Sequence, residues 1–394
     1  MKSHPYSRLP GSSYWRQAVA NVPPDDVDPM GDPPFRLGAR DKIVTAGSCF
    51  AQHIGRHLAQ SGCNYLVTEK AHPFLTADAA QALNYGLYSA RYGNVYTSRQ
   101  LLQLFDRAYG RFVPKENYWR EGADVVIDPF RPQIQEGGFN SLRELDLDRD
   151  QHFAAVREAF ETLDVFVFTL GLTEAWRARA DGAVFPLCPG VAGGDYAPEA
   201  HEFVNFGVDE VVADMTGFFE RLWGVNPGAR VILTVSPVPL VATAERRHVM
   251  VSTMASKSIL RVACDTLERR FANVAYFPSY EIVAGGYCGV DYFGPDRRSV
   301  TPEGVAHVMR VFDRRFIKRG LVEEAMRRTV KAFAPSPPAP PDPVADAMKL
   351  MCDEEALALA PVSSSPGEES ATPEASAIDE GPGQTQNGTD AAAD

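Results

Sequence analysis

The chain has 394 residues, of which 45% are hydrophobic and 23% are charged, and this composition is typical of a soluble globular protein. The formal net charge is -12, but the segment from Pro335 onward contains twelve acidic residues and a single lysine. Nearly all of the excess negative charge therefore lies in that segment, and the almost neutral remainder gives no support for nucleic-acid binding.

The sequence gives no sign of export or of membrane insertion. Its first residues, MKSHPYSRLPGSSYWRQ, contain no apolar run of the kind found in signal peptides. No apolar stretch approaches the roughly 20 residues that a membrane helix requires. The six cysteines are scattered without a CxxC pair, which argues against a zinc site and a disulfide framework. We therefore expect a cytoplasmic protein with reduced thiols, no membrane span, no metal and no cofactor.

Composition divides the chain into three regions. Residues 1–40 are rich in Pro, Gly and Asp, and we expect them to form an extended arm. Residues 41–333 have the pattern of one α/β domain, in which residues 88–151 form an insertion or lid. Residues 334–394 begin with a proline-rich run and continue as an acidic tail, a composition that predicts disorder. Recruitment of a protein partner by this tail is a weaker hypothesis, and the sequence identifies no such partner.

Short apolar runs alternate with helical patterns along the domain. Buried strands are predicted at residues 43–46, 164–169, 230–236 and 273–277, with a weaker one at 64–67. Phe50, Ile54 and Leu58 share one face of a helix after the first strand. Thr301 is the expected N-cap of the last helix, with Pro302 in its first turn. This alternation predicts a three-layer α/β/α sandwich around a mainly parallel sheet.

The loops that follow the predicted strands are unusually small or polar. In a parallel sheet these loops meet at the carboxyl edge, where ligands bind. They are GSCF at residues 47–50, LGLTEAW at 170–176, and the longer segments 236–248 and 278–304. We expect any functional site to lie where they converge.

Five stretches of the sequence together resemble the GSCFA domain family. They are GSCFA at residues 47–51, LGLTEAW at 170–176, LTVSPVPL at 233–240, SKSILR at 256–261 and YFPSYEI at 276–282. The resemblance covers about residues 40–320. That family is similar to the SGNH or GDSL-like hydrolases, which have a flavodoxin-like sheet and include esterases and acyltransferases. The resemblance therefore implies this fold, and it implies chemistry on an acyl ester.

The resemblance also assigns roles to individual residues. Ser48 falls on the nucleophile, and its backbone N–H is one expected donor to the oxyanion. Gly86, in the stretch LNYGL, resembles the second-block glycine that supplies another donor, and Asn84 beside it can add an amide. Thr173 stands where related hydrolases have an asparagine in the oxyanion hole. Glu174 next to it is a candidate for contacting substrate, together with Trp176, although both suit a wall of the site equally well.

The last block departs from the pattern of the related hydrolases. They place Asp-x-x-His before the final helix, whereas this chain has Asp296 followed by Ser299 at the histidine position. A serine hydroxyl is not a general base near neutral pH, so the usual triad lacks its middle member. His248 is our first candidate for the missing base, followed by His201 and then His307. His53 and His57, on the helix after Ser48, suit helix packing or the surface better.

Simpler explanations exist for the same residues. Ser48 can merely cap the following helix. Cys49 at the helix start can be proposed as a thiolate nucleophile, but a small core residue is the better interpretation. Lys257 can bind an anionic group, although a solvated helix start is the commoner meaning. Arg297 and Arg298 can hold a phosphate or form an ordinary surface pair.

We expect a serine esterase or O-acyltransferase whose substrate is an acyl ester on a small molecule or glycan, such as an O-acetyl group. The alternative is a catalytically silent relative that binds a glycan or a protein, which the serine at position 299 favours. The sequence specifies neither the acyl donor, nor hydrolysis or transfer, nor the oligomeric state.

Overall fold

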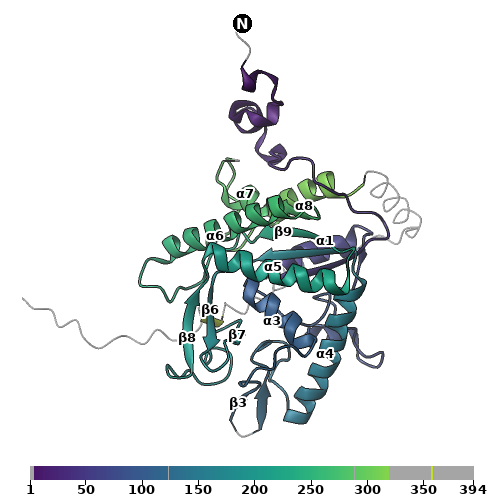
Figure 1. Cartoon of the computed structure of the whole chain (residues 1–394), viewed down its shortest axis with the longest axis vertical. Helices are drawn as coiled ribbons and strands as arrows, with labels where there is room; N and C mark the ends of the chain where they lie inside the picture. The colour runs from purple at the N-terminus through teal and green to yellow at the C-terminus, as the bar shows by residue number, and fades with distance from the viewer. Residues whose placement is uncertain (1–3, 123, 288, 319–355, 358–394) are drawn as a thin grey trace, which may run out of the picture. The chain divides into compact units, whose positions relative to one another are not determined.

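The fold is described from a computed structural model that covers residues 4–122, 124–287, 289–318 and 356–357, all of which belong to one compact unit (Figure 1). The predicted tail, residues 334–394, lies outside the described residues apart from 356–357. Within the described part of the chain, no helix is both long and apolar enough to cross a membrane. None of the cysteines described forms a disulfide.

A five-stranded sheet lies at the centre of the domain, and every strand pair in it is parallel. Its strand order is β10-β9-β5-β1-β2, the flavodoxin-like order. The strands are β1 (Lys42–Gly47), β2 (Asn64–Tyr65), β5 (Val165–Leu170), β9 (Arg230–Val235) and β10 (Val274–Phe277). Each falls on a predicted run, so the strands and the mainly parallel sheet are confirmed. They are apolar on both faces because helices cover both sides.

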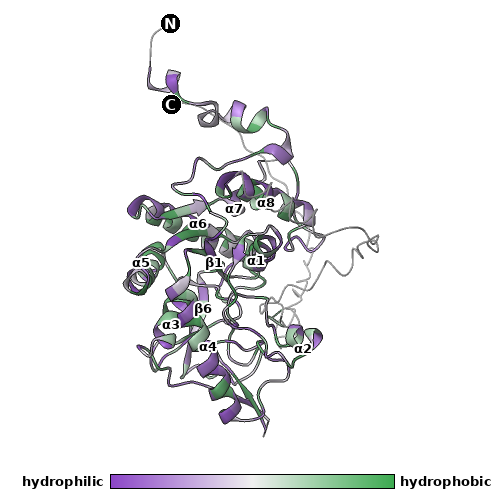
Figure 2. Ribbon diagram, turned by 90° about the vertical axis from the view of Figure 1, so that its right-hand side faces the viewer, coloured by the Kyte–Doolittle hydropathy of each residue, from purple (hydrophilic) through white to green (hydrophobic). Residues whose placement is uncertain are grey.

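The two helical layers complete the predicted sandwich. One face of the sheet packs against α1 (Phe50–Gln60), α7 (Ser279–Ala284) and α8 (Pro302–Phe316). The other face packs against α3 (Ser98–Ala108), α4 (Leu142–Thr162), α5 (Val208–Val225) and α6 (Val249–Arg270). In Figure 2, α1 and α5 lie on opposite sides of β1. The three-layer α/β/α fold is thus confirmed.

Of the helix starts predicted from the sequence, that of α8 is confirmed and that of α1 differs. Thr301 caps α8 as expected, because its side chain accepts a hydrogen bond from the Gly304 N–H. Phe50, Ile54 and Leu58 are buried on one face of α1, also as expected. Ser48, however, is not the cap of α1. The N-cap position is Cys49, and no side chain caps this helix.

Several smaller elements were not predicted from the sequence. A second sheet has the order β7-β6-β8 and consists of β6 (Glu174–Ala178), β7 (Val184–Phe185) and β8 (His201–Asn205). The stretch LGLTEAW, expected to be a loop, is therefore the end of β5 and the start of β6. The remaining elements are a hairpin of β3 (Trp119–Glu121) and β4 (Val125–Ile127), and the short helix α2 (Ala77–Ala82).

The region of residues 88–151 contributes directly to the core. Its helix α3 carries Leu101, Leu104 and Phe105 into the apolar cluster beneath the sheet. Before α3, the Val95 N–H donates to the Gly47 carbonyl at 2.8 Å, and the Tyr96 carbonyl accepts from the Gly171 N–H at 2.9 Å. This region, expected to form an insertion or lid, thus supplies part of one helical layer and touches the ends of β1 and β5.

The N-terminal arm contains short helical turns and then packs on α8. The turns are η1 (Pro5–Arg8), η2 (Gly11–Ser13), η3 (Arg16–Ala20) and η4 (Pro24–Asp26). Further on, Leu37 forms a parallel bridge with Ile317, and its N–H donates to the Phe316 carbonyl at 2.7 Å. The start and the end of the domain therefore meet.

Gly47 at the end of β1 permits the close approach of β5. Its φ is +140°, and a Cβ built there would lie 2.4 Å from the Thr169 carbonyl oxygen. We expect Gly47→Ala to reduce the free energy of unfolding by roughly 3 kcal/mol or more, because backbone strain and a backbone clash combine. Urea titration followed by circular dichroism measures this difference.

Gly110→Ala is the matched control, because Gly110 also has positive φ (+67°) but has open space around it. Strain alone is expected there, about 1 kcal/mol. Equal losses in the two variants would show that the approach of β5 to Gly47 does not constrain the fold.

Candidate active site

Ser48 lies at the topological switch point of the sheet. The chain leaves β1 for β2 on one side, whereas β5 pairs with β1 on the other side. In open α/β sheets, ligands bind in the crevice at the carboxyl ends of these two strands. Ser48 directly follows β1, and Gly171 directly follows β5. The predicted convergence of the two loops is therefore present.

The side-chain oxygen of Ser48 is buried and has no hydrogen-bond partner among the described residues. The cap explanation for Ser48 is wrong, since a capping hydroxyl would accept from an amide of α1. The backbone N–H of Ser48 donates to the Thr169 carbonyl at 3.1 Å. Our expectation that this N–H is a donor to the oxyanion is therefore also wrong, because the sheet already uses it.

Gly171 lies against Ser48 and connects it to a buried lysine. A Cβ built on Gly171 would be 2.9 Å from the Ser48 Cβ, so only glycine leaves this space. The Gly171 carbonyl accepts a hydrogen bond of 2.7 Å from the Nζ atom of Lys257. Lys257 is only 1% exposed, so its interpretation as a solvated helix start is wrong. The lysine enters the site from α6.

An apolar cover shields this part of the sheet edge. Tyr96, Leu172 and Leu240 form a small buried cluster, and the Tyr96 ring would be 3.2 Å from a Cβ at Gly171. Leu240 belongs to the predicted loop of residues 236–248. Ser48 itself is 3% exposed. A substrate that reaches Ser48 must therefore displace part of this cover. Cys49 is similarly buried, which fits its interpretation as a core residue.

Thr173 belongs to a polar network, and its hydroxyl is already engaged. Its N–H donates to the Ser256 Oγ at 3.1 Å, and its hydroxyl lies within hydrogen-bond distance of Asn205 Oδ1 and Ser256 Oγ. Thr173 is also fully buried. Thr173 therefore supports the loop beside Gly171. Its hydroxyl could donate to an oxyanion only after it gives up its hydrogen bonds to Asn205 and Ser256.

Glu174 is buried under the loop of residues 236–248. Its carboxylate accepts hydrogen bonds from the Thr243 hydroxyl at 2.8 and 3.0 Å. Burial raises the pKa of Glu174, although these hydrogen bonds oppose the rise. The carboxylate therefore holds this loop to β6. Trp176, two residues further along β6, packs against the rings of Tyr196 and Phe203.

Asn84 and Gly86 lie elsewhere. The Asn84 amide donates to the carbonyls of Gln133 and Ile134, and both Asn84 and Gly86 line a separate pocket beside α1. No hydrogen bond between described residues connects either of them to Ser48. The segment that does reach the end of β1 is Gly93–Asn94–Val95, through the bond from Val95 to Gly47. The sequence feature that marks this segment is the dipeptide Gly-Asn in YGNVY, at residues 92–96. The similar stretch LNYGL, at residues 83–87, drew the prediction to the wrong glycine.

Asp296 binds its own loop. Its carboxylate accepts from the N–H groups of Arg298 and Ser299 and from the Ser299 hydroxyl, the last at 2.5 Å. These hydrogen bonds, chiefly that of the Ser299 hydroxyl, lower the pKa of Asp296. Ser299 thus completes a compact turn and supplies no base. Arg298 donates to the Pro239 carbonyl, which connects this turn to the loop of residues 236–248.

The three candidate histidines all have other partners. His248 is exposed and caps α6 by accepting from the Met250 N–H, nine residues before Lys257 and so about 13 Å away along the helix. His201 is buried and bonded to Glu116 at 2.9 Å. His307 is buried between the Tyr292 hydroxyl and the Val27 carbonyl. No imidazole among the described residues lies within hydrogen-bond distance of the Ser48 oxygen.

His53 and His57 occupy α1, as expected for packing residues. His57 Nε2 lies 2.7 Å from the Asp313 carboxylate on α8. His53 packs against the Phe50 ring. Burial, reinforced by Arg56, lowers the pKa of His53 to about 4.

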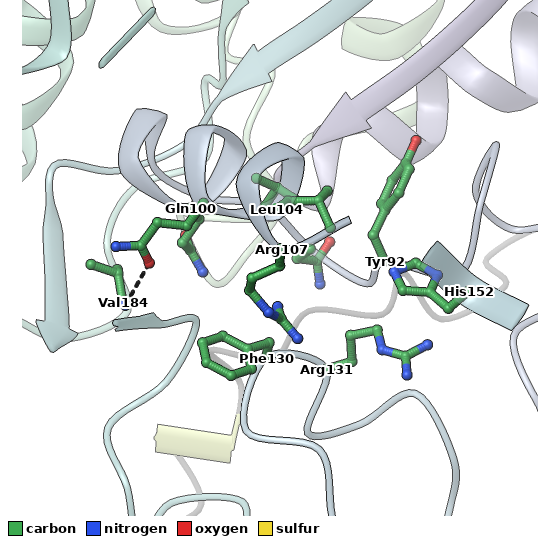
Figure 3. A pocket seen from close by; sticks show the side chains of 11 residues that line it. Tyr92, Gln100, Leu104, Arg107, Phe130, Arg131, His152 and Val184 are labelled. Carbon is green, nitrogen blue, oxygen red and sulfur yellow. Dashed lines mark hydrogen bonds between the residues drawn. The ribbon is translucent and has the colours of Figure 1, made fainter. Parts of the chain in front are cut away.

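A buried ionic cluster holds residues 88–151 to the domain, next to a cavity of about 20 Å³ (Figure 3). Within this region, Arg131 pairs with Asp128 and Asp148 at 2.9 and 2.8 Å. Glu69, which precedes the region, accepts a hydrogen bond of 2.6 Å from the Arg91 N–H and lies 2.7 Å from His152 Nδ1. Burial alone would raise the pKa of Glu69, but His152 and Arg131 bring it down to about 2. This cluster is structural, because it shares no residue with the Ser48 site.

Comparison with known protein families identifies the family of this chain. A family model described as the GSCFA family matches residues 42–312, well over half of the chain. No curated protein matches the chain.

The lowered pKa of His53 predicts that the protein becomes less stable in acid. The unfolded chain binds a proton near pH 6.5, whereas folded His53 stays neutral until about pH 4. The free energy of unfolding should therefore fall as the pH drops from 6.5 to 4, by on the order of 3 kcal/mol from this group. Urea titrations at several pH values measure it.

His53→Gln should flatten the profile in this window, and His72→Gln, at an exposed position, should leave it unchanged. If the wild type and His53→Gln had parallel profiles, the burial of neutral His53 would not be the cause.

Proposed function

We propose that this chain, which belongs to the GSCFA family, is a serine hydrolase or O-acyltransferase that acts on an acyl ester through Ser48. The observation that carries the proposal is the unpartnered, buried hydroxyl at the switch point, beside Gly171 and its bond to Lys257. Buried polar atoms in proteins nearly always have partners, so an orphan hydroxyl at a ligand-binding edge calls for a functional explanation.

Lys257 takes the place of the missing imidazole in this proposal. A buried amine serves as the base in serine–lysine hydrolases. In its neutral form, the Lys257 amine would leave the Gly171 carbonyl and accept the proton of the Ser48 hydroxyl as the Ser48 oxygen attacks the ester carbonyl carbon. The same proton would then go to the departing alcohol oxygen, leaving an acyl group on Ser48. Water or a second alcohol would attack this acyl-enzyme, which gives hydrolysis or transfer.

The start of α1 would stabilise the negative charge that forms on the carbonyl oxygen. The helix begins at Phe50, two residues after Ser48. The N–H groups of Ala51 and Gln52 already donate to the carbonyls of Ser48 and Cys49, so the Phe50 N–H and the positive end of the helix dipole would supply this stabilisation. An O-acetyl group on a glycan is a suitable ester, as the resemblance implies. Entry of any ester requires the cover of Tyr96, Leu172 and Leu240 to open.

An alkyl fluorophosphonate probe tests this proposal, because it reacts covalently with activated serines. We expect labelling of the wild type at one site, loss of labelling in Ser48→Ala, and at least about a hundredfold slower labelling in Lys257→Met, as for removal of a general base. Mass spectrometry identifies the labelled peptide and gives the rate.

Ser13→Ala and Lys70→Met, at exposed positions, are the matched controls and should label at the wild-type rate. Labelling of Ser48→Ala as fast as the wild type would exclude Ser48 as nucleophile. An unchanged rate in Lys257→Met with a reduced rate in His248→Ala would assign the base to His248 instead.

A second candidate function is that of a silent relative that binds a glycan or protein partner at the same edge. The observation that favours it is the Ser299 hydroxyl on Asp296, where related hydrolases have histidine. Under this proposal, 4-nitrophenyl acetate is not hydrolysed above background, and acetylated xylan oligosaccharides bind Ser48→Ala as tightly as the wild type in calorimetry. Turnover that depends on Ser48 would contradict it.

A further inference from the structure

A second pocket, of about 810 Å³, lies beside α1, and neither Ser48 nor Gly171 lines it. It is bounded by α1, by β2 and by residues 81–87, and its size suits a small-molecule ligand. Arg56, on α1, lies eight residues after Ser48, or about 12 Å along the helix direction. The pocket is therefore separate from the Ser48 site.

Arg56 gives this pocket an uncompensated positive charge. The Nη2 atom of Arg56 is buried and has no partner, and its guanidinium forms no hydrogen bond or ion pair with any residue that the structure describes. The lining contains no aspartate or glutamate. Arg56 is half-buried, and burial lowers its pKa, an effect that Tyr88 opposes only in part. An anionic ligand would supply the missing partner.

The remaining polar lining suits hydroxyl groups. Four side-chain amides line the pocket, from Gln60, Asn64, Gln81 and Asn84. The amide nitrogens of Asn64 and Asn84 donate to backbone carbonyls, which fixes both side chains, while their Oδ1 atoms accept no hydrogen bond from a described residue. Tyr85 adds an aromatic ring to the same wall. Fixed amide oxygens and an aromatic ring are groups that bind sugar hydroxyls and sugar faces.

We infer that this pocket binds an anionic, hydroxyl-rich small molecule, a sugar acid or a sugar phosphate. Its carboxylate or phosphate pairs with the Arg56 guanidinium, because the planar fork of arginine matches both groups. Its hydroxyl groups donate to the Oδ1 atoms of Asn64 and Asn84. The site is independent of the Ser48 chemistry, and it holds whether the chain is an enzyme or a silent relative.

Isothermal titration calorimetry on the full-length chain tests the inference, with glucuronate, glucose 6-phosphate, glucose and inorganic phosphate as probes. We expect one of the two anionic sugars to bind at least tenfold more tightly than glucose and than inorganic phosphate. Which anionic sugar binds distinguishes a carboxylate from a phosphate ligand. Wild-type binding of neither, or of glucose equally well, overturns the inference.

Variants locate the binding. Arg56→Gln should weaken it at least tenfold, as expected for loss of a charge-assisted hydrogen bond. Arg56→Lys keeps the charge and should retain part of the affinity. Arg120→Gln, at an exposed arginine of β3, is the matched control. Ser48→Ala should bind the anionic sugar as tightly as the wild type. A lack of sugar binding and a lack of Ser48-dependent catalysis are therefore distinguishable results. Unchanged affinity in a folded Arg56→Gln overturns the assignment.

If Arg56→Gln does not fold, Asn84→Asp gives an independent measurement. A second negative charge in the pocket repels an anion, so binding should weaken at least tenfold while a neutral probe is unaffected. Anion binding that survives this change places the ligand outside the pocket and overturns the inference.

Discussion

The approach of β5 to β1 is the constraint on which the rest of the site depends. Because Gly47 has no side chain, the Thr169 carbonyl reaches the Ser48 N–H and extends the ladder of the sheet by one bond. That bond fixes the backbone of Ser48 and removes its N–H from chemistry. The absence of a side chain at Gly171 then leaves room for the Ser48 side chain. Two adjacent strands therefore determine where the hydroxyl lies.

The strands could be predicted from the sequence because each is apolar at both odd and even positions. Such a run fits only a sheet that is covered by helices on both faces. The sequence predicted α8 because Thr301 and Pro302 act locally. It did not predict the burial of Lys257, since a lysine in a helix looks the same whether it faces water or a carbonyl that is distant in sequence. For the same reason it pointed to Gly86, which does not reach β1. Which glycine meets β1 depends on how residues 88–151 fold back, and the ionic cluster of Glu69, His152 and Arg131 fixes that path.

The orphan hydroxyl of Ser48 and the missing imidazole together limit the mechanism. A buried hydroxyl without a partner destabilises a fold by about 1–3 kcal/mol, so packing elsewhere offsets it. Two buried apolar clusters, one on each face of the sheet, provide ample packing. Ser299, where the resemblance led us to expect a histidine, instead completes a tight turn on Asp296. Under the proposed hydrolase function the base would be Lys257, and under the silent alternative no base is needed.

The bridge between Leu37 and Ile317 has a consequence for engineering. These residues border the domain in sequence yet are hydrogen-bonded neighbours, since the Leu37 carbonyl also lies 3.4 Å from the Lys318 N–H. A circularly permuted chain in which a short linker joins 318 to 37 would hardly disturb the backbone at the junction. New ends opened at the exposed residues Arg179 and Ala180 would then place a fluorescent reporter beside the second sheet, at the end of β6 that lies away from Gly171.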